Sequence, residues 1–170
     1  MLSETFAHLA LIFFTFVMIF AALKDVTTMK ISNKLVLTLC GAFIIFAPIA
    51  GFAVIEIGQA LGTGVLVLIG TFTLFSLGLI GGGDAKFAAA TAIWLGPEGM
   101  LAFLVITMLI GGGLALGLLV FRKVPLPVSL SGQSWVSRLQ APGTGVPYAL
   151  AMAPAALLVI PTTAWFTFVA

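Results

Sequence analysis

Charged residues are scarce in this chain, and their scarcity excludes a water-soluble protein. Only 7% of the 170 residues are charged, whereas 62% are hydrophobic. A soluble domain usually carries about 25% charged residues. With so few polar side chains the chain cannot cover its surface against water, so it needs lipid around it.

Cysteine is almost absent as well, and the basic residues are not gathered in one stretch. The single Cys40 lies in an apolar run, which excludes a disulfide framework and a CxxC zinc site. We interpret Cys40 as a small buried hydrophobic residue. The net charge is +2, but no dense basic stripe is present, so nucleic acid is not an expected partner.

Apolar runs predict an all-α, polytopic membrane protein. A helix needs roughly 20 apolar residues to cross a bilayer, and a shorter run between Asp84 and Pro97 would rise only about 20 Å. The first run is long for a signal peptide and follows no basic residue, so we expect it to be retained. We predict one transmembrane domain, 1–170, with six transmembrane helices at about 5–23, 35–55, 60–80, 85–97, 100–121 and 146–169.

The charges predict how these helices are oriented. With six spans, all seven Lys and Arg fall on one side of the membrane, and Glu4, Glu56 and Glu98 fall on the other. Because basic residues favour the cytoplasmic side, we predict extracytoplasmic N- and C-termini and a cytoplasmic loop at 122–145. Residues 130–139 of that loop suit either a short amphipathic helix or a linker punctuated by proline and glycine.

Two acids remain once these charges are placed, Asp25 and Asp84. The chain crosses the membrane out and back between them, so both are predicted at cytoplasmic helix ends, where they can meet. Two carboxylates held close together share one proton. The ionised one can take a proton from water while the protonated one polarises a scissile carbonyl, as in aspartic proteases. Two acids alone make a poor Mg²⁺ site, and a proton relay in a transporter stays an alternative.

Glycines precede the second acid, in the run Gly78-Leu79-Ile80-Gly81-Gly82-Gly83-Asp84. Consecutive glycines weaken a helix and allow close backbone approach. A protease must hold its substrate extended, so we predict that unwound backbone in this run accepts a substrate strand through main-chain hydrogen bonds. Helix packing through small residues is the alternative. Lys86 is expected either to pair with an acid or to reach the membrane interface.

Three motifs occur in order along the chain. Residues 81–86 read GGGDAK, a GxGDxK pattern; Asp25 is followed, after five residues, by Ile31-Ser32-Asn33; and Gly145-Val146-Pro147-Tyr148 opens the last predicted helix. Together they resemble the type IV prepilin peptidase family, whose triplet often has proline where this chain has serine. The chain resembles the short, peptidase-only branch that serves tight-adherence (Flp-type) pili and related secretion systems.

The resemblance implies a single transmembrane peptidase domain with aspartic-type endopeptidase activity. Such an enzyme removes the basic leader peptide from type IV or Flp-type prepilins and pseudopilins, at the cytoplasmic face of the inner (plasma) membrane. It implies catalysis without metal or cofactor, and leader peptides and the lipid bilayer as partners. An archaeal preflagellin peptidase, and a proton-coupled transporter or secretion assembly subunit, are the alternatives. The implied catalytic residues are Asp25 and Asp84, and the substrate-binding or motif residues are Gly81, Gly82, Gly83, Lys86, Asn33 and Pro147.

Overall fold

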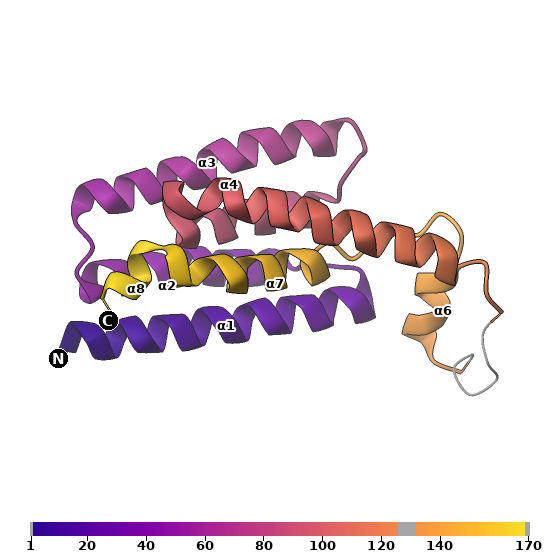
Figure 1. Ribbon diagram of the computed structural model, residues 1–170, viewed down its shortest axis with the longest axis horizontal. Helices are drawn as coiled ribbons and strands as arrows, with labels where there is room; N and C mark the ends of the chain where they lie inside the picture. The colour runs from indigo at the N-terminus through magenta and orange to yellow at the C-terminus, as the bar shows by residue number, and fades with distance from the viewer. Residues whose placement is uncertain (1, 126–131, 169–170) are drawn as a thin grey trace.

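The computed structural model describes residues 2–125 and 132–168, and every regular element within them is helical (Figure 1). The predicted all-α class is therefore confirmed. The elements in chain order are α1 (Leu2–Thr28), α2 (Asn33–Ala50), α3 (Val54–Ser76), α4 (Gly82–Phe121), α6 (Ser134–Gln140), α7 (Ala149–Val159), the 3₁₀ turn η1 (Ile160–Thr162) and α8 (Ala164–Thr167).

Local capping explains the limits of the second and third helices. Ser32 is the N-cap of α2, and its hydroxyl accepts a hydrogen bond from the backbone N–H of Leu35 at 3.3 Å. Gly51 ends α2 in the left-handed conformation, with φ 109°. At the start of α3 the Glu56 carboxylate accepts a hydrogen bond from the backbone N–H of Ala53 at 2.6 Å. Both helices therefore start and end earlier than the sequence predicts.

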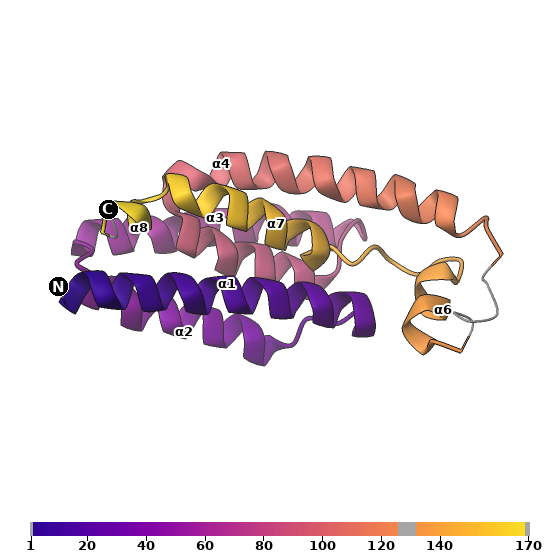
Figure 2. The ribbon, with the colours of Figure 1, turned by 60° about the horizontal axis from the view of Figure 1, so that its bottom comes forward.

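Helix α4 changes direction at Gly96. The φ of 65° and ψ of −175° at Gly96 interrupt the helix, and Pro97 follows. Figures 1 and 2 show that the part of α4 after Gly96 runs back beside the part before it. The sequence predicts separate helices at 85–97 and 100–121. The break falls at Gly96 because glycine tolerates this φ and proline fits the first turn of a helix.

Among the residues that the structure describes, four helices are long and apolar enough to cross a membrane, namely α1, α2, α3 and α4. Helix α4 has 40 residues. Gly96 divides it into two antiparallel parts. At 1.5 Å per residue the part after Gly96 rises about 37 Å and can cross roughly 30 Å of hydrocarbon, whereas the part before it rises only about 21 Å. A shorter apolar helix, 149–162, follows near the C-terminus. Six crossings and the orientation of the termini stay predictions.

The last predicted helix, 146–169, is interrupted. Helix α7 begins at Ala149, and Pro161 lies in the 3₁₀ turn between α7 and α8. Proline lacks a backbone N–H, and its ring clashes with the preceding helical turn. Residue 169 of the predicted helix lies outside the described residues.

The predicted loop 122–145 contains one short helix, α6, on which Val136 and Leu139 are buried. In the described part of the loop, the structure therefore has the helix and not the linker. Residues 126–131, which include the start of the predicted amphipathic segment, lie outside the described residues.

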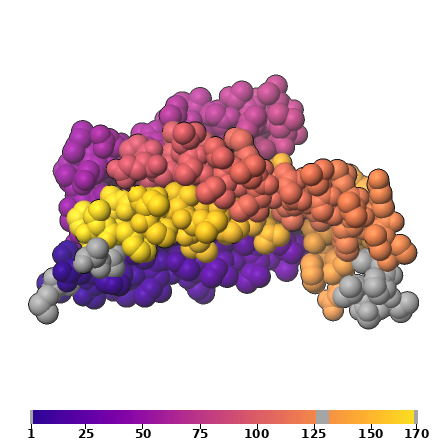
Figure 3. Space-filling model, viewed as in Figure 1, coloured from indigo at the N-terminus to yellow at the C-terminus, as the bar shows by residue number. Residues whose placement is uncertain are grey.

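Two buried tryptophans, Trp94 and Trp165, lie in the core near the end of the bundle that holds α8. The indole N–H of Trp94 donates a hydrogen bond to the carbonyl of Leu39 at 2.9 Å, and that of Trp165 donates to the carbonyl of Trp94 at 2.9 Å. The two ring centroids lie 5.0 Å apart. Both buried indole N–H groups are thus satisfied. Farther along the bundle, α7 lies between α1 and α4 and contacts both (Figure 3).

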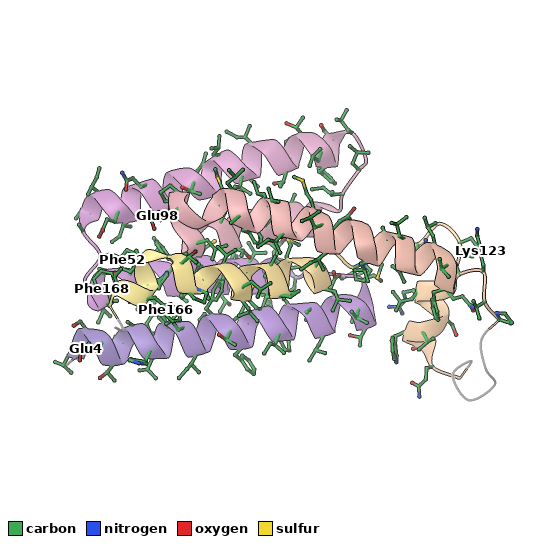
Figure 4. All side chains as sticks on the ribbon, in the orientation of Figure 1. Glu4, Phe52, Glu98, Lys123, Phe166 and Phe168 are labelled. Atoms are coloured by element: carbon green, nitrogen blue, oxygen red, sulfur yellow. The ribbon has the colours of Figure 1, made fainter. Side chains whose placement is uncertain are left out.

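The charged residues separate to the two ends of the bundle. Glu4 and Glu98 lie at the end that holds α8, and Lys123 lies at the opposite end (Figure 4). Glu56 lines the same small cavity as Glu98. We call these ends the glutamate end and the basic end. The residues at the basic end include all seven Lys and Arg, namely Lys24, Lys30, Lys34, Lys86, Arg122, Lys123 and Arg138.

Candidate active site

Asp25 lies near the end of α1, at the basic end, and is only 4% exposed. Its Oδ2 accepts a hydrogen bond from the backbone N–H of Ala149 at 2.9 Å. Ala149 is the first residue of α7, which has no side-chain cap of its own. The Asp25 carboxylate therefore caps a helix 124 residues away along the chain, and the positive end of that helix favours its negative charge.

Asp84 lies in the first turn of α4, behind the N-cap Gly81. Its carboxylate accepts a hydrogen bond from the backbone N–H of Gly81, and it also faces the positive end of its own helix. The side chain is half-buried. A Cβ atom at Gly81 would lie 2.7 Å from Oδ2 of Asp84, so any other residue at 81 would displace this carboxylate.

Both acids line one cavity of about 740 Å³ at the basic end. Asp25 and Asp84 are close enough for the charge of one to act on the other. One wall of the cavity comes from the end of α1 and the turn that leads into α2, and the other from the start of α4. The lining residues are Lys24, Asp25, Thr28, Met29, Lys30, Ile31, Ser32, Asn33, Gly81, Gly82, Gly83 and Asp84.

Two of the three glycines do not have the predicted unwound backbone. Gly82 and Gly83 belong to the first turn of α4, while the non-helical backbone covers residues 77–81. Their small size serves close packing instead. A Cβ atom at Gly83 would lie 3.3 Å from the backbone oxygen of Ile31, and one at Gly82 would lie 3.2 Å from the ring of Phe75. The packing alternative is thus the one found for Gly82 and Gly83.

Lys86 and Asn33 bind each other. Lys86 Nζ donates a hydrogen bond to Asn33 Oδ1 at 3.2 Å. This contact ties the start of α4 to the start of α2. Lys86 therefore bonds to an amide in this contact and not to an acid, while its reach to the membrane interface stays a prediction. Asn33 lines the cavity, whereas Lys86 does not.

Pro147 lies away from the cavity lining. It is fully buried, and its carbonyl accepts a hydrogen bond from the backbone N–H of Leu150 at 3.1 Å, in the turn that opens α7. This position sets the direction of α7 and so the place of Ala149. Pro147 is thus two residues from the group that binds Asp25, and it acts on the cavity only through the backbone.

Arg122, which holds the motif at residues 145–148 in place, was not identified in the sequence analysis. The Arg122 guanidinium donates hydrogen bonds to three carbonyls: Nε to Leu139 at 3.0 Å, and Nη2 to Thr144 at 2.6 Å and to Gly145 at 3.1 Å. These bonds fix the segment that leads to Ala149. No sequence pattern marks a backbone N–H such as that of Ala149 as a partner for an acid, because every residue except proline has one.

Asp25 and Asp84 are the two acidic side chains among the described residues that line the cavity. Among the described residues, no group of three or more His, Cys, Asp or Glu side chains could hold a metal ion. Two carboxylates alone give too few oxygen ligands for Mg²⁺ or Ca²⁺. The arrangement is instead that of two acids which can share a proton over a space large enough for water and a peptide segment.

The fold and the cavity define a helical membrane protein with two acids at one end of its bundle. Residues 12–116 match the model of the type IV leader peptidase family. This match covers more than half of the chain and includes both Asp25 and Asp84, so the chain belongs to that family. The resemblance drawn from the motifs is thereby confirmed, although the match ends before the motif at 145–148.

A curated relative adds detail to this assignment. A prepilin leader peptidase/N-methyltransferase from Aeromonas hydrophila is 26% identical over 151 residues, which cover 81% of this chain and 51% of the relative. The chain thus spans about half the length of this relative. No solved structure gives a significant match. Family membership and the apolar helices together indicate an integral membrane protein.

Proposed function

We propose that this protein is an aspartic-type endopeptidase that removes the basic leader peptide from type IV or Flp-type prepilins and pseudopilins. The observation that carries the proposal is that Asp25 of α1 and Asp84 of α4, far apart in the sequence, line one cavity. The family and the name of the Aeromonas relative support the reaction and the substrate class.

The proposed reaction uses both carboxyl groups. The ionised one takes a proton from a water molecule as the water oxygen bonds to the scissile carbonyl carbon. The protonated one donates a hydrogen bond to the carbonyl oxygen, where negative charge develops. The proton then passes to the leaving nitrogen as the C–N bond breaks. The surroundings of the two acids differ, since Asp25 is buried against Ala149 and Asp84 is half-buried, and such a difference suits unequal roles.

The cavity also suits an extended peptide. Its volume of about 740 Å³ lies within the range of ligand sites. The backbone of residues 77–81 is non-helical and leads directly to Asp84. The N–H groups of residues 77–79 are bonded within the preceding turn and that of Gly81 to Asp84. A substrate strand would therefore bind this segment chiefly through its carbonyl oxygens. The substrate would then lie beside both carboxyl groups.

The proposed location is the inner (plasma) membrane, with six crossings and the basic end in the cytoplasm. The separation of seven basic residues from the three glutamates supports this orientation. The cavity and its two acids lie at the basic end, so cleavage would take place at the cytoplasmic face.

Cleavage of a prepilin by the purified protein tests the proposal. The protein is reconstituted in liposomes with a prepilin precursor, and the products are identified by mass spectrometry. We expect a shortened pilin and a free leader peptide. A proton-coupled transporter or an assembly subunit would leave every pilin precursor intact, and a preflagellin peptidase would cleave preflagellin instead.

A further inference from the structure

An apolar groove lies beside the cavity, between α3 and the first part of α4. It consists of two hollows, of about 630 Å³ and about 230 Å³, which share Leu68 and Lys86 and are therefore continuous. The larger hollow also shares Gly82 with the cavity of the two acids. We call the two hollows together the α3/α4 groove. Cys40, which the sequence predicts to be buried, is half-buried and lines its far part.

We propose that the α3/α4 groove binds the apolar helix of the substrate, on the side of the cleaved bond that stays in the membrane. This inference rests on the proposed peptidase function and names the surface that would receive the substrate. A basic leader cannot enter a groove lined by apolar side chains without losing its hydration. The groove is thus suited to the apolar part of the substrate, while the leader stays at the basic end.

The length and shape of the groove fit a helix. Along α3 it runs from Leu61 to Phe75, with Leu68 midway. These residues repeat at seven-residue spacing and so lie on one face of α3. The distance they span is about 21 Å at 1.5 Å per residue, or two-thirds of the roughly 30 Å of hydrocarbon. A groove of this length can hold an apolar helix over most of its path through the membrane.

Small residues on α4 form the other wall. Ala85 and Ala89 are buried, lie four residues apart and line the groove. In lipid, helices associate mainly through close packing against small residues. The groove is also held in shape, because Thr71 Oγ1 of α3 donates a hydrogen bond to the carbonyl of Ala85 at 3.2 Å. This wall therefore offers a fixed surface for a second helix.

Gly82 marks the passage from the cavity to the groove. The ring of Phe75 lies 3.2 Å from the position of a Cβ atom at Gly82, so a larger residue there would narrow the passage. Lys86 keeps the groove apolar, because its stem lines the groove while its amine binds Asn33. A substrate can thus lie extended across the two acids and continue as a helix along α3. This continuity favours the substrate over a lipid chain or a second copy of the protein.

A kinetic comparison of two substrates tests the groove. One substrate is a prepilin with its apolar helix, and the other is a peptide with the same leader and cleavage site but without that helix. Leu68→Trp fills the groove where its two hollows meet. The matched control is Leu66→Trp, since Leu66 lies on the same helix, is 59% exposed and lines neither hollow.

We expect Leu68→Trp to lower the ratio of kcat/KM for the prepilin to kcat/KM for the peptide about ten-fold or more. In Leu66→Trp this ratio should stay within about two-fold of wild type. An unchanged ratio in Leu68→Trp, with wild-type cleavage of both substrates, would overturn the groove and leave the proposed function standing. Wild-type protein that cleaves neither substrate would overturn the proposed function itself.

Photo-cross-linking decides the occupant independently of activity. A photo-reactive amino acid is placed at position 68, and in a second preparation at position 66, in liposomes that contain the uncleaved prepilin. We expect an adduct between position 68 and the apolar helix of the prepilin, and little adduct at position 66. Lipid adducts alone, or a dimer of the protein linked through position 68, would contradict the proposal.

Discussion

The substitutions Asp25→Asn and Asp84→Asn test whether the two acids form one catalytic unit. Asparagine has nearly the same volume as aspartate, and its side-chain oxygen still accepts a hydrogen bond. At position 25 it can accept from the backbone N–H of Ala149, and at position 84 from that of Gly81. What each substitution removes is the ability to hold and exchange a proton.

The expected effect on stability is small and can be bounded from these contacts. A lost N-cap costs about 1 kcal/mol, and a buried N–H left without a partner costs about 1–3 kcal/mol. Asp25→Ala would incur a cost in this range once, because the cap and the acceptor of the buried Ala149 N–H are the same hydrogen bond. Asp25→Asn keeps an acceptor there, so its free energy of unfolding should change by less than about 1 kcal/mol.

The expected effect on activity is large. A positioned general acid or base contributes about 10²–10⁴-fold to a rate, so each Asn variant should lose about 1,000-fold or more, which is about 4 kcal/mol of transition-state stabilisation. The double variant should be hardly slower than either single one, because residues that act as a unit are not additive. If the second substitution lowered the rate again by a similar factor, the two acids would have independent roles.

The assay is prepilin cleavage in liposomes at matched protein levels, with thermal unfolding measured in parallel. Glu98→Gln is the control, because it makes the same chemical change at the glutamate end, and it should retain wild-type activity. Robust cleavage by Asp25→Asn or by Asp84→Asn would refute the pairing of the two acids. Loss of cleavage in Glu98→Gln would show that the loss is not specific to the cavity.

Three further predictions concern the same cavity and its place in the membrane. Gly81→Ala should lower kcat about 100-fold, since its Cβ would lie 2.7 Å from a carboxylate oxygen of Asp84; Gly70→Ala, which meets nothing within 4 Å, should keep full activity. A cysteine introduced at Lys123 should be labelled only from the cytoplasm, and one at Val54, which is 87% exposed, only from outside. The reverse labelling pattern would contradict the proposed orientation. A chelator should leave cleavage unchanged, and activity restored only by added metal would contradict the two-acid reaction.

The class of fold could be predicted because it depends on composition. Few charges and long apolar runs leave only a helical membrane protein, since backbone groups in lipid must be paired within the chain. The limits of the helices were less predictable. Gly51 and Gly96 end helical segments through a positive φ, yet other glycines of this chain lie inside helices, and only the surrounding packing separates the two cases.

The candidate acids could also be predicted, because an ionisable side chain in an apolar segment is costly to place in the membrane and is usually functional. The roles of their neighbours could not. Lys86 bonds to Asn33, which is 53 residues away. Gly82 and Gly83 form the first turn of α4, where the glycine run predicted unwound backbone. In both cases local preference was overruled by contacts between distant segments.

By itself, the amino-acid sequence determined that the chain is helical and needs lipid, that its basic residues separate from its glutamates, and that Asp25 and Asp84 are its unusual acids. These properties follow from residue type and order, which fix hydrophobicity and charge. The tertiary structure alone decided that the two acids share a cavity, that Asp25 caps α7 at Ala149, and that a groove continues from Gly82 along α3. Such features depend on which backbone groups and helix faces meet in space, and those meetings arise only when the whole chain is packed.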